Sequence, residues 1–113
     1  MTLAAVVTGT GLRNEDGSSR ARVIRRCCGV GCEVVLRKSS SSSEATPVVA
    51  VYLPVPRLFG LLPSSYAQIG DLDRRAAASI LDRLDESGEI RARVKSVHAP
   101  EEKDNPRVSL FID

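Results

Sequence analysis

The sequence predicts a mainly β fold with two inserted helices (α+β), arranged as a small, OB-like or SH3-like, partly open β-barrel. Short runs rich in Val, Leu and Ile recur along the chain, with turn-forming residues between them. Only two segments have the apolar spacing of an amphipathic helix, which is too few for a doubly wound sheet. Because 113 residues fit one domain, we expect a single domain over residues 1–113.

About six strands are expected, from β-branched runs and from alternation of apolar and polar residues. They are residues 3–8, 33–37, 47–53, 66–69, 89–95 and 107–112. The stretch from Leu53 to Ser65 contains Pro54, Pro56 and Pro63, and we expect it to be a loop because proline cannot donate to a strand ladder. The last strand should turn its apolar side chains to one face.

Two helices are expected between these strands. The first, residues 20–28, follows a turn at residues 14–17, can be capped by Ser18 or Ser19, and has a basic outer face. The second, residues 71–87, is the clearest element, with Asp71 or Asp73 as its cap and Gly88 at its end. Its apolar stripe contains Leu72, Ala76, Ile80 and Leu84.

Composition is typical of a globular protein, with 42% hydrophobic and 27% charged residues. The first residues contain no basic region, and no apolar segment approaches the length of a membrane span, so we expect a cytoplasmic protein with no membrane contact. Cys27, Cys28 and Cys32 lie within six positions. An odd number so crowded is not a secreted disulfide framework, and we expect reduced, partly buried thiols.

Residues for catalysis or metal binding are scarce. His98 is the only histidine, so a catalytic triad or a zinc protease site is not indicated. The three cysteines lack a fourth zinc ligand. The Gly-x-Gly pairs at residues 9–11 and 29–31 do not continue as a dinucleotide or P-loop fingerprint. We therefore expect a protein that is not an enzyme and holds no metal or cofactor.

Positive charge is the most informative chemical feature. Residues 18–38 contain six cations against the single carboxylate of Glu33, and a later strand alternates Arg91, Arg93 and Lys95 with apolar residues. If these groups converge in a small barrel, they would bind the phosphates of a nucleic acid. The alternative is that they are dispersed over the surface and neutralised by carboxylates such as Glu89, and the sequence leaves both open.

The order of segments carries a family resemblance. Asp16-Gly17-Ser18-Ser19-Arg20 leads into a helix, Gly31 to Arg37 forms a strand, and a polar loop precedes Val48 to Tyr52. Gln68-Ile69-Gly70, an Ala-rich helix and the strand from Ile90 to Val97 follow. This succession covers almost the whole chain and resembles the HIRAN domain in its free-standing bacterial form.

The resemblance implies an OB-like barrel that binds the 3′-hydroxyl end of single-stranded DNA, as this domain does in eukaryotic remodelling helicases. Arg20 matches the family's arginine after the first turn, and Arg74 lies where a basic residue follows the Ile-Gly turn, whereas Asp71 replaces an aromatic or a histidine. The loop at residues 39–49 lacks the family's aspartate and stacking aromatic, with Glu44 as the nearest substitute. A Pro-rich insertion occupies residues 53–67.

We therefore expect a non-catalytic nucleic-acid-binding module, with single-stranded DNA or DNA ends as ligand, that assists repair or remodelling enzymes. A protein-interaction domain that docks through the apolar loop from Leu58 to Leu62 is the alternative, and a thiol-dependent enzyme would rest on the cysteines alone. The expected phosphate-binding residues are Arg20, Arg22, Arg25, Arg37, Arg74, Arg91 and Arg93.

The apolar stripe of the second helix generates a first prediction. Ile80→Asp should unfold the domain, because it places an unpaired charge where the helix packs on the barrel. Thermal unfolding followed by circular dichroism measures the effect, and an Ile80→Asp variant with unchanged thermal stability would contradict this placement of the helix.

Overall fold

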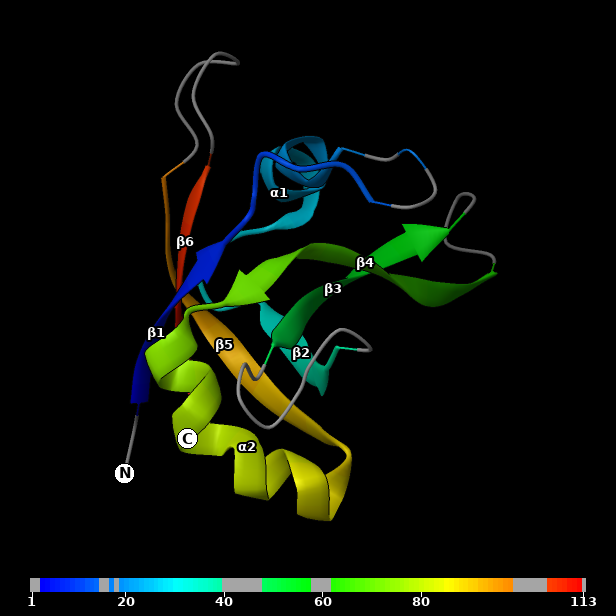
Figure 1. Ribbon diagram of the computed structural model, residues 1–113. Coiled ribbons are helices and arrows are strands. Elements are labelled where there is room, and N and C mark those ends of the chain that lie inside the picture. The colour runs from blue at the N-terminus through cyan, green and yellow to red at the C-terminus, as the bar shows by residue number, and fades with distance from the viewer. Residues whose placement is uncertain are drawn as a thin grey trace.

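The structure, a computed structural model (Figure 1), describes residues 3–14, 17, 19–39, 48–57, 62–98 and 106–112, without the side chains of residues 27, 55–57 and 62–65. Within these ranges the chain forms six strands and two helices. Their order is β1 (Leu3–Thr8), α1 (Arg20–Cys27), β2 (Glu33–Lys38), β3 (Val49–Arg57), β4 (Leu62–Leu72), α2 (Arg74–Ser87), β5 (Glu89–His98) and β6 (Arg107–Ile112). The mainly β class with two inserted helices is confirmed.

The strands form one antiparallel barrel in the order β1-β4-β3-β2-β5-β6. The barrel is closed, whereas the sequence analysis predicted a partly open one. β1 makes the closure, because it pairs with β6 from Leu3 to Val7 and with β4 at Val7 and Thr8. The seam between β1 and β4 has only these two paired positions, Val7 with Leu72 and Thr8 with Asp71, and no single strand's sequence shows where such a seam falls.

The interior of the barrel is aliphatic, as the scarcity of aromatic residues predicts. α1 and α2 lie at opposite ends of the barrel (Figure 1). α1 buries Ile24 and packs against β4, while α2 packs against β1, β2 and β5. The predicted stripe of α2 is buried through Ala76, Ile80 and Leu84, and Leu72 is buried as well but belongs to β4.

Side-chain caps determine where both helices begin. Ser19 is the N-cap of α1 and accepts a hydrogen bond from the Arg22 amide. Asp73, rather than Asp71, is the N-cap of α2 and accepts from the Ala76 amide at 3.2 Å. Gly88 ends α2 with a φ of 82°, a conformation that favours glycine.

The longest hairpin replaces a predicted loop. β3 continues to Arg57 and β4 begins at Leu62, so most of residues 53–65 are strand, and Pro54 pairs with Tyr66. The loop prediction was wrong because β2 pairs with β3 only as far as Tyr52. Beyond that residue β3 has one neighbouring strand, and proline is tolerated where one edge of a strand is unpaired. The expected short strand at residues 66–69 is accordingly part of the longer β4.

Gly70 generates a prediction about the barrel seam. A Cβ atom at this position would lie 2.3 Å from the Thr8 carbonyl oxygen and 2.5 Å from a Val7 methyl group, so β1 and β4 would have to move apart. Gly70→Ala should therefore lower the free energy of unfolding by about 1–3 kcal/mol or more, measured by urea denaturation.

Gly29→Ala is the matched control for this change. Its added Cβ would meet only the Cys32 sulfur, at an ordinary contact distance of 3.8 Å. It should change the free energy of unfolding by less than about 1 kcal/mol. Equal losses in the two variants would show that close approach at the seam does not limit stability.

Candidate nucleic-acid interface

Alternation along the strands divides the barrel into an aliphatic interior and a basic exterior. In β2, Val34 and Leu36 enter the core while Glu33 and Arg37 are exposed. In β5, Ile90, Ala92 and Val94 are buried and the residues between them face outward. Because β2 pairs with β5, the outward cations Arg37, Arg91, Arg93 and Lys95 lie on two neighbouring strands.

All three aromatic residues that the structure describes point to the outside of the barrel. Tyr66 on β4 is 47% exposed, Phe111 on β6 is 40% exposed, and Tyr52 on β3 is half-buried. Phe111 pairs with Arg93, and Tyr52 pairs with Val35 of β2. These aromatics therefore border the basic strands β2 and β5 on both sides.

Each ring contacts a cation. The Arg37 guanidinium carbon is 5.7 Å from the centre of the Tyr52 ring and 5.4 Å from the centre of the Tyr66 ring. The Lys95 ammonium nitrogen is 5.1 Å from the centre of the Phe111 ring. Such contacts are worth about 0.5–1 kcal/mol at exposed sites. We call this surface the aromatic–basic face; its residues are Arg37, Tyr52, Tyr66, Arg91, Arg93, Lys95 and Phe111.

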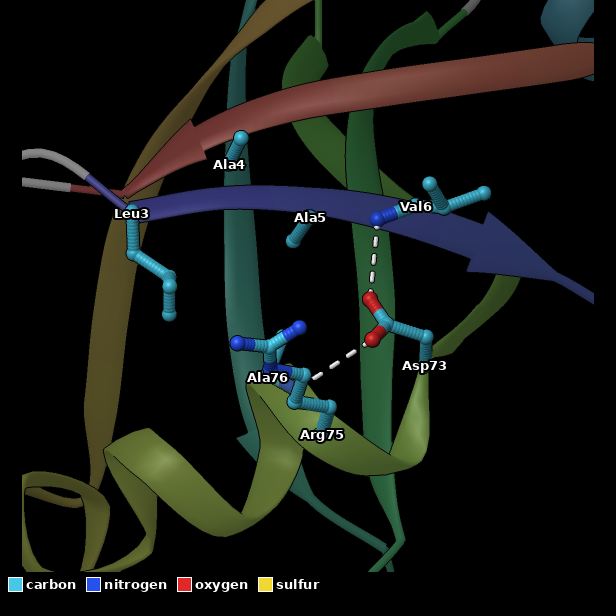
Figure 2. A pocket seen from close by; sticks show the side chains of 7 residues that line it. All are labelled: Leu3, Ala4, Ala5, Val6, Asp73, Arg75 and Ala76. Carbon is cyan, nitrogen blue, oxygen red and sulfur yellow. Dashed lines mark hydrogen bonds between the residues drawn. The ribbon is translucent and has the colours of Figure 1, made fainter.

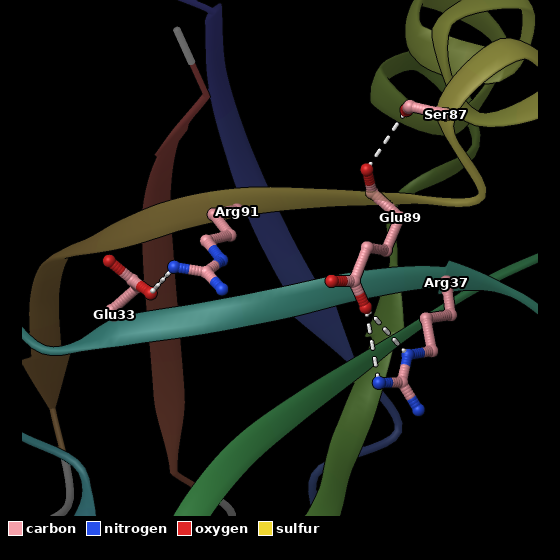
Figure 3. Close-up of polar contacts among 5 residues, drawn as sticks. All are labelled: Glu33, Arg37, Ser87, Glu89 and Arg91. Atoms are coloured by element: carbon pink, nitrogen blue, oxygen red, sulfur yellow. Dashed lines mark hydrogen bonds and ion pairs between the residues drawn. The ribbon is translucent and has the colours of Figure 1, made fainter.

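Two carboxylates lie among these cations (Figure 3). The Arg37 guanidinium donates through Nε and Nη2 to the same Glu89 oxygen, at 3.2 and 3.1 Å. Arg91 Nη1 lies 3.4 Å from a Glu33 oxygen. All four side chains are substantially exposed, and exposed ion pairs contribute about 0–1 kcal/mol each. Four cations against two carboxylates leave the face positively charged.

The seven predicted binding residues do not converge on one site. Arg37, Arg91 and Arg93 meet on the aromatic–basic face. Arg22 and Arg25 lie on α1 at one end of the barrel, and Arg74 is the first residue of α2 at the other end (Figure 1). The alternative of dispersed and partly neutralised charge therefore applies to some of the seven residues: the residues of the two helices are dispersed, and Arg37 and Arg91 are ion-paired.

Arg20, expected to contact phosphate, is instead buried, with 8% of its surface exposed. Its Nε donates to the Asn14 side-chain oxygen at 2.9 Å and its Nη1 donates to the Gly9 carbonyl at 3.2 Å. Asn14 donates in turn to the Gln68 carbonyl, and the Gln68 amide donates to the Asp71 carboxylate at 3.1 Å. Arg20 and Gln68, which the HIRAN resemblance singles out, thus fasten the loop after β1 to β4.

The aromatic half of the aromatic–basic face was not expected from the sequence. The signal was present in the alternation of the strands, since Phe111 lies between Leu110 and Ile112, and both of these neighbours are buried. Tyr52 has the same relation to Val51 and Leu53. The position of Tyr66 was not readable, because the segment before it was expected to be a loop.

A cavity of about 380 Å³ lies between β1 and the first turn of α2 (Figure 2). Its walls are mostly apolar, and both oxygens of its one carboxylate are occupied: Asp73 accepts from the Val6 amide at 2.9 Å and from the Ala76 amide. The lining residues are Leu3, Ala4, Ala5, Val6, Asp73, Arg75 and Ala76. These contacts show that the cavity lies at the junction between α2 and the edge of β1.

The cysteines and the histidine lie outside the aromatic–basic face. Cys28 and Cys32 are half-buried and pack against the core, and the Cys27 side chain lies outside the described residues. His98 is exposed at the end of β5. In the part of the chain that the structure describes, no group of three or more His, Cys, Asp or Glu residues is placed to hold a metal ion.

In comparisons with known proteins, no family model, no curated protein and no solved structure matches the chain. The described helices include none with the length and apolar character needed to cross a membrane.

The burial of Arg20 generates a prediction about stability rather than binding. Arg20→Met should lower the free energy of unfolding by about 2–4 kcal/mol in urea denaturation, because it leaves the Asn14 oxygen and the Gly9 carbonyl without their charged donor. Arg22→Met, an exposed change in the same helix, should stay within about 0.5 kcal/mol of the unaltered protein. If both variants keep the full free energy of unfolding, the hydrogen bonds of Arg20 do not stabilise the fold.

Proposed function

We propose that the chain is a non-catalytic module that binds single-stranded nucleic acid, with DNA as the first candidate, across the aromatic–basic face. The observation that carries this proposal is the placement of Tyr52, Tyr66 and Phe111 on the outside of the barrel, each against a cation. Bases stack on such rings while cations contact the adjacent phosphates, and together these two contacts are what sequence-tolerant binding of a single strand requires.

The dimensions of the face suit a short single-stranded segment. Tyr66, Tyr52, Arg37, Arg93 and Phe111 lie on the successive strands β4, β3, β2, β5 and β6. Arg37 and Arg93 are offset by four residues along the strands, since Arg37 pairs with Glu89 and Arg93 pairs with Glu33, so the path is longer than the roughly 19 Å of four inter-strand spacings of about 4.8 Å. OB-like barrels bind about 4–16 nucleotides each, and a path of this kind lies within that range.

The HIRAN resemblance supports the same class of ligand and a setting beside a repair or remodelling enzyme in the cytoplasm. It does not extend to recognition of a 3′-hydroxyl, because the loop of residues 39–49 has neither the family's aspartate nor its aromatic. Contacts to phosphates and stacked bases carry little sequence information. Free and phosphorylated 3′ ends should accordingly bind within about tenfold of each other.

The protein-interaction alternative depended on the loop from Leu58 to Leu62. Residues 58–61 and the side chain of residue 62 lie outside the described residues. The aromatic–basic face favours nucleic acid, because a surface with four cations and three rings matches an anionic ligand that has flat bases.

Binding can be tested with the intrinsic fluorescence of the protein. The chain has no tryptophan, and both of its tyrosines lie on the aromatic–basic face. The anisotropy of a labelled oligothymidine should rise when the protein binds it. Bound oligothymidine should quench the tyrosine emission of the protein over the same concentration range. The logarithm of affinity should fall with the logarithm of salt concentration, with a slope of about −0.7 for each phosphate neutralised.

Three variants identify the face that binds. Tyr66→Ala should weaken binding by about 5- to 100-fold through loss of stacking, and Arg93→Ala should weaken it and reduce the salt slope by about one contact. Arg22→Ala removes the same charge from α1 and should leave affinity nearly unchanged. Absence of binding at low salt, or equal losses in Arg22→Ala and Arg93→Ala, would refute this assignment.

A further inference from the structure

We infer that Glu89 competes with the nucleic-acid ligand: its carboxylate occupies one of the two edges through which the Arg37 guanidinium can bind a phosphate. This inference rests on the proposed function and adds a regulatory element to it. The aromatic–basic face would then exist in two arrangements, one with Arg37 held by Glu89 and one with Arg37 released to a phosphate.

The competition follows from which atoms of Arg37 are used. Nε and Nη2 both donate to the Glu89 carboxylate, at 3.2 and 3.1 Å (Figure 3). These two nitrogens form one of the two edges of the guanidinium that can bind a phosphate in bidentate geometry. A phosphate can therefore take this edge only when the Glu89 carboxylate leaves it.

Release of Arg37 also changes the stacking surface. While Glu89 holds it, the guanidinium lies over both the Tyr52 and the Tyr66 rings, within 5.7 Å of their centres. A base that stacks on either ring has to share the ring face with this cation or displace it. The carboxylate thus limits both kinds of contact that the face offers, phosphate binding and stacking.

The backbone keeps Glu89 opposite Arg37. The two residues are register partners across β2 and β5. Glu89 begins β5 directly after Gly88, which ends α2, and the Ser87 hydroxyl lies 2.9 Å from the Glu89 carbonyl oxygen (Figure 3). Only the Glu89 side chain is therefore free to move away when a ligand arrives.

The ion pair is weak enough to be displaced. The Arg37 and Glu89 side chains are 46% and 41% exposed, and such pairs contribute about 0–1 kcal/mol. A nucleic-acid strand with several phosphates can compensate for the loss of the Arg37–Glu89 ion pair by adding contacts at Arg91 and Arg93. Affinity should thus depend on Glu89 without being abolished by it.

Asp85 provides a charge-matched comparison. It pairs with Lys38 at 3.4 Å, and these side chains are 54% and 45% exposed, close to the values for Glu89 and Arg37. Lys38 makes no ring contact in the described part of the chain, and it presents a single ammonium rather than a bidentate edge. A general effect of negative charge should appear at Asp85 and Glu89 alike, whereas competition for Arg37 should appear at Glu89 alone.

The test compares Glu89→Gln with Asp85→Asn in the anisotropy assay with labelled oligothymidine. Glu89→Gln should bind about three- to tenfold more tightly than the unaltered protein at low salt, with a salt slope steeper by about 0.7. Asp85→Asn should change affinity less than about twofold. Combining Glu89→Gln with Arg37→Ala should abolish the gain, because the competed group is then absent.

Two results would overturn the inference while leaving the proposed function intact. One is an equal gain in Asp85→Asn and Glu89→Gln, and the other is a gain that persists in the Arg37→Ala background. Failure of every variant to bind at low salt would instead refute the proposed function, and the inference with it. Thermal unfolding of each variant establishes that the compared proteins are folded.

Discussion

Closure of the barrel depends on the close approach of β1 to β4. Only two residue positions pair across this seam, and the absence of a side chain at Gly70 lets the Thr8 carbonyl oxygen lie 2.3 Å from the position that a Cβ atom would take. The registers of the remaining strands are fixed by longer pairings, but these would form an open sheet if the seam failed. The curved exterior, on which side chains from five strands gather, exists because β1 completes the circle.

Closure also explains why the aromatic residues lie outside. A six-stranded barrel has a narrow interior, and here Val, Leu, Ile and Ala side chains fill it. Rings as large as those of Tyr52, Tyr66 and Phe111 are placed by strand alternation on the convex surface, where each is partly covered by a long cationic side chain. The aliphatic packing inside and the exposed rings and cations outside are thus two results of the same period-two pattern.

Much of the fold could be predicted from local pattern, and the failures share a physical cause. Ile80 and Leu84 followed from helical spacing, and the outward direction of Arg91 and Arg93 followed from alternation. Strand order, the burial of Arg20 and the strand conformation of Pro54 depend on neighbours distant in sequence. Arg20 is buried because Asn14 and the Gly9 carbonyl meet it there, and Pro54 is tolerated because β2 has already ended. No periodicity in one segment contains that information.

Asp73 connects the helix α2 to the strand β1 through hydrogen bonds. One of its carboxylate oxygens accepts from the Val6 amide of β1 and the other from the Ala76 amide of α2, while its own amide donates to the Val6 carbonyl. Unwinding the first turn of α2 therefore also exposes backbone groups at the edge of β1. Detachment of α2 from an intact barrel would therefore break hydrogen bonds of both the helix and the edge of β1.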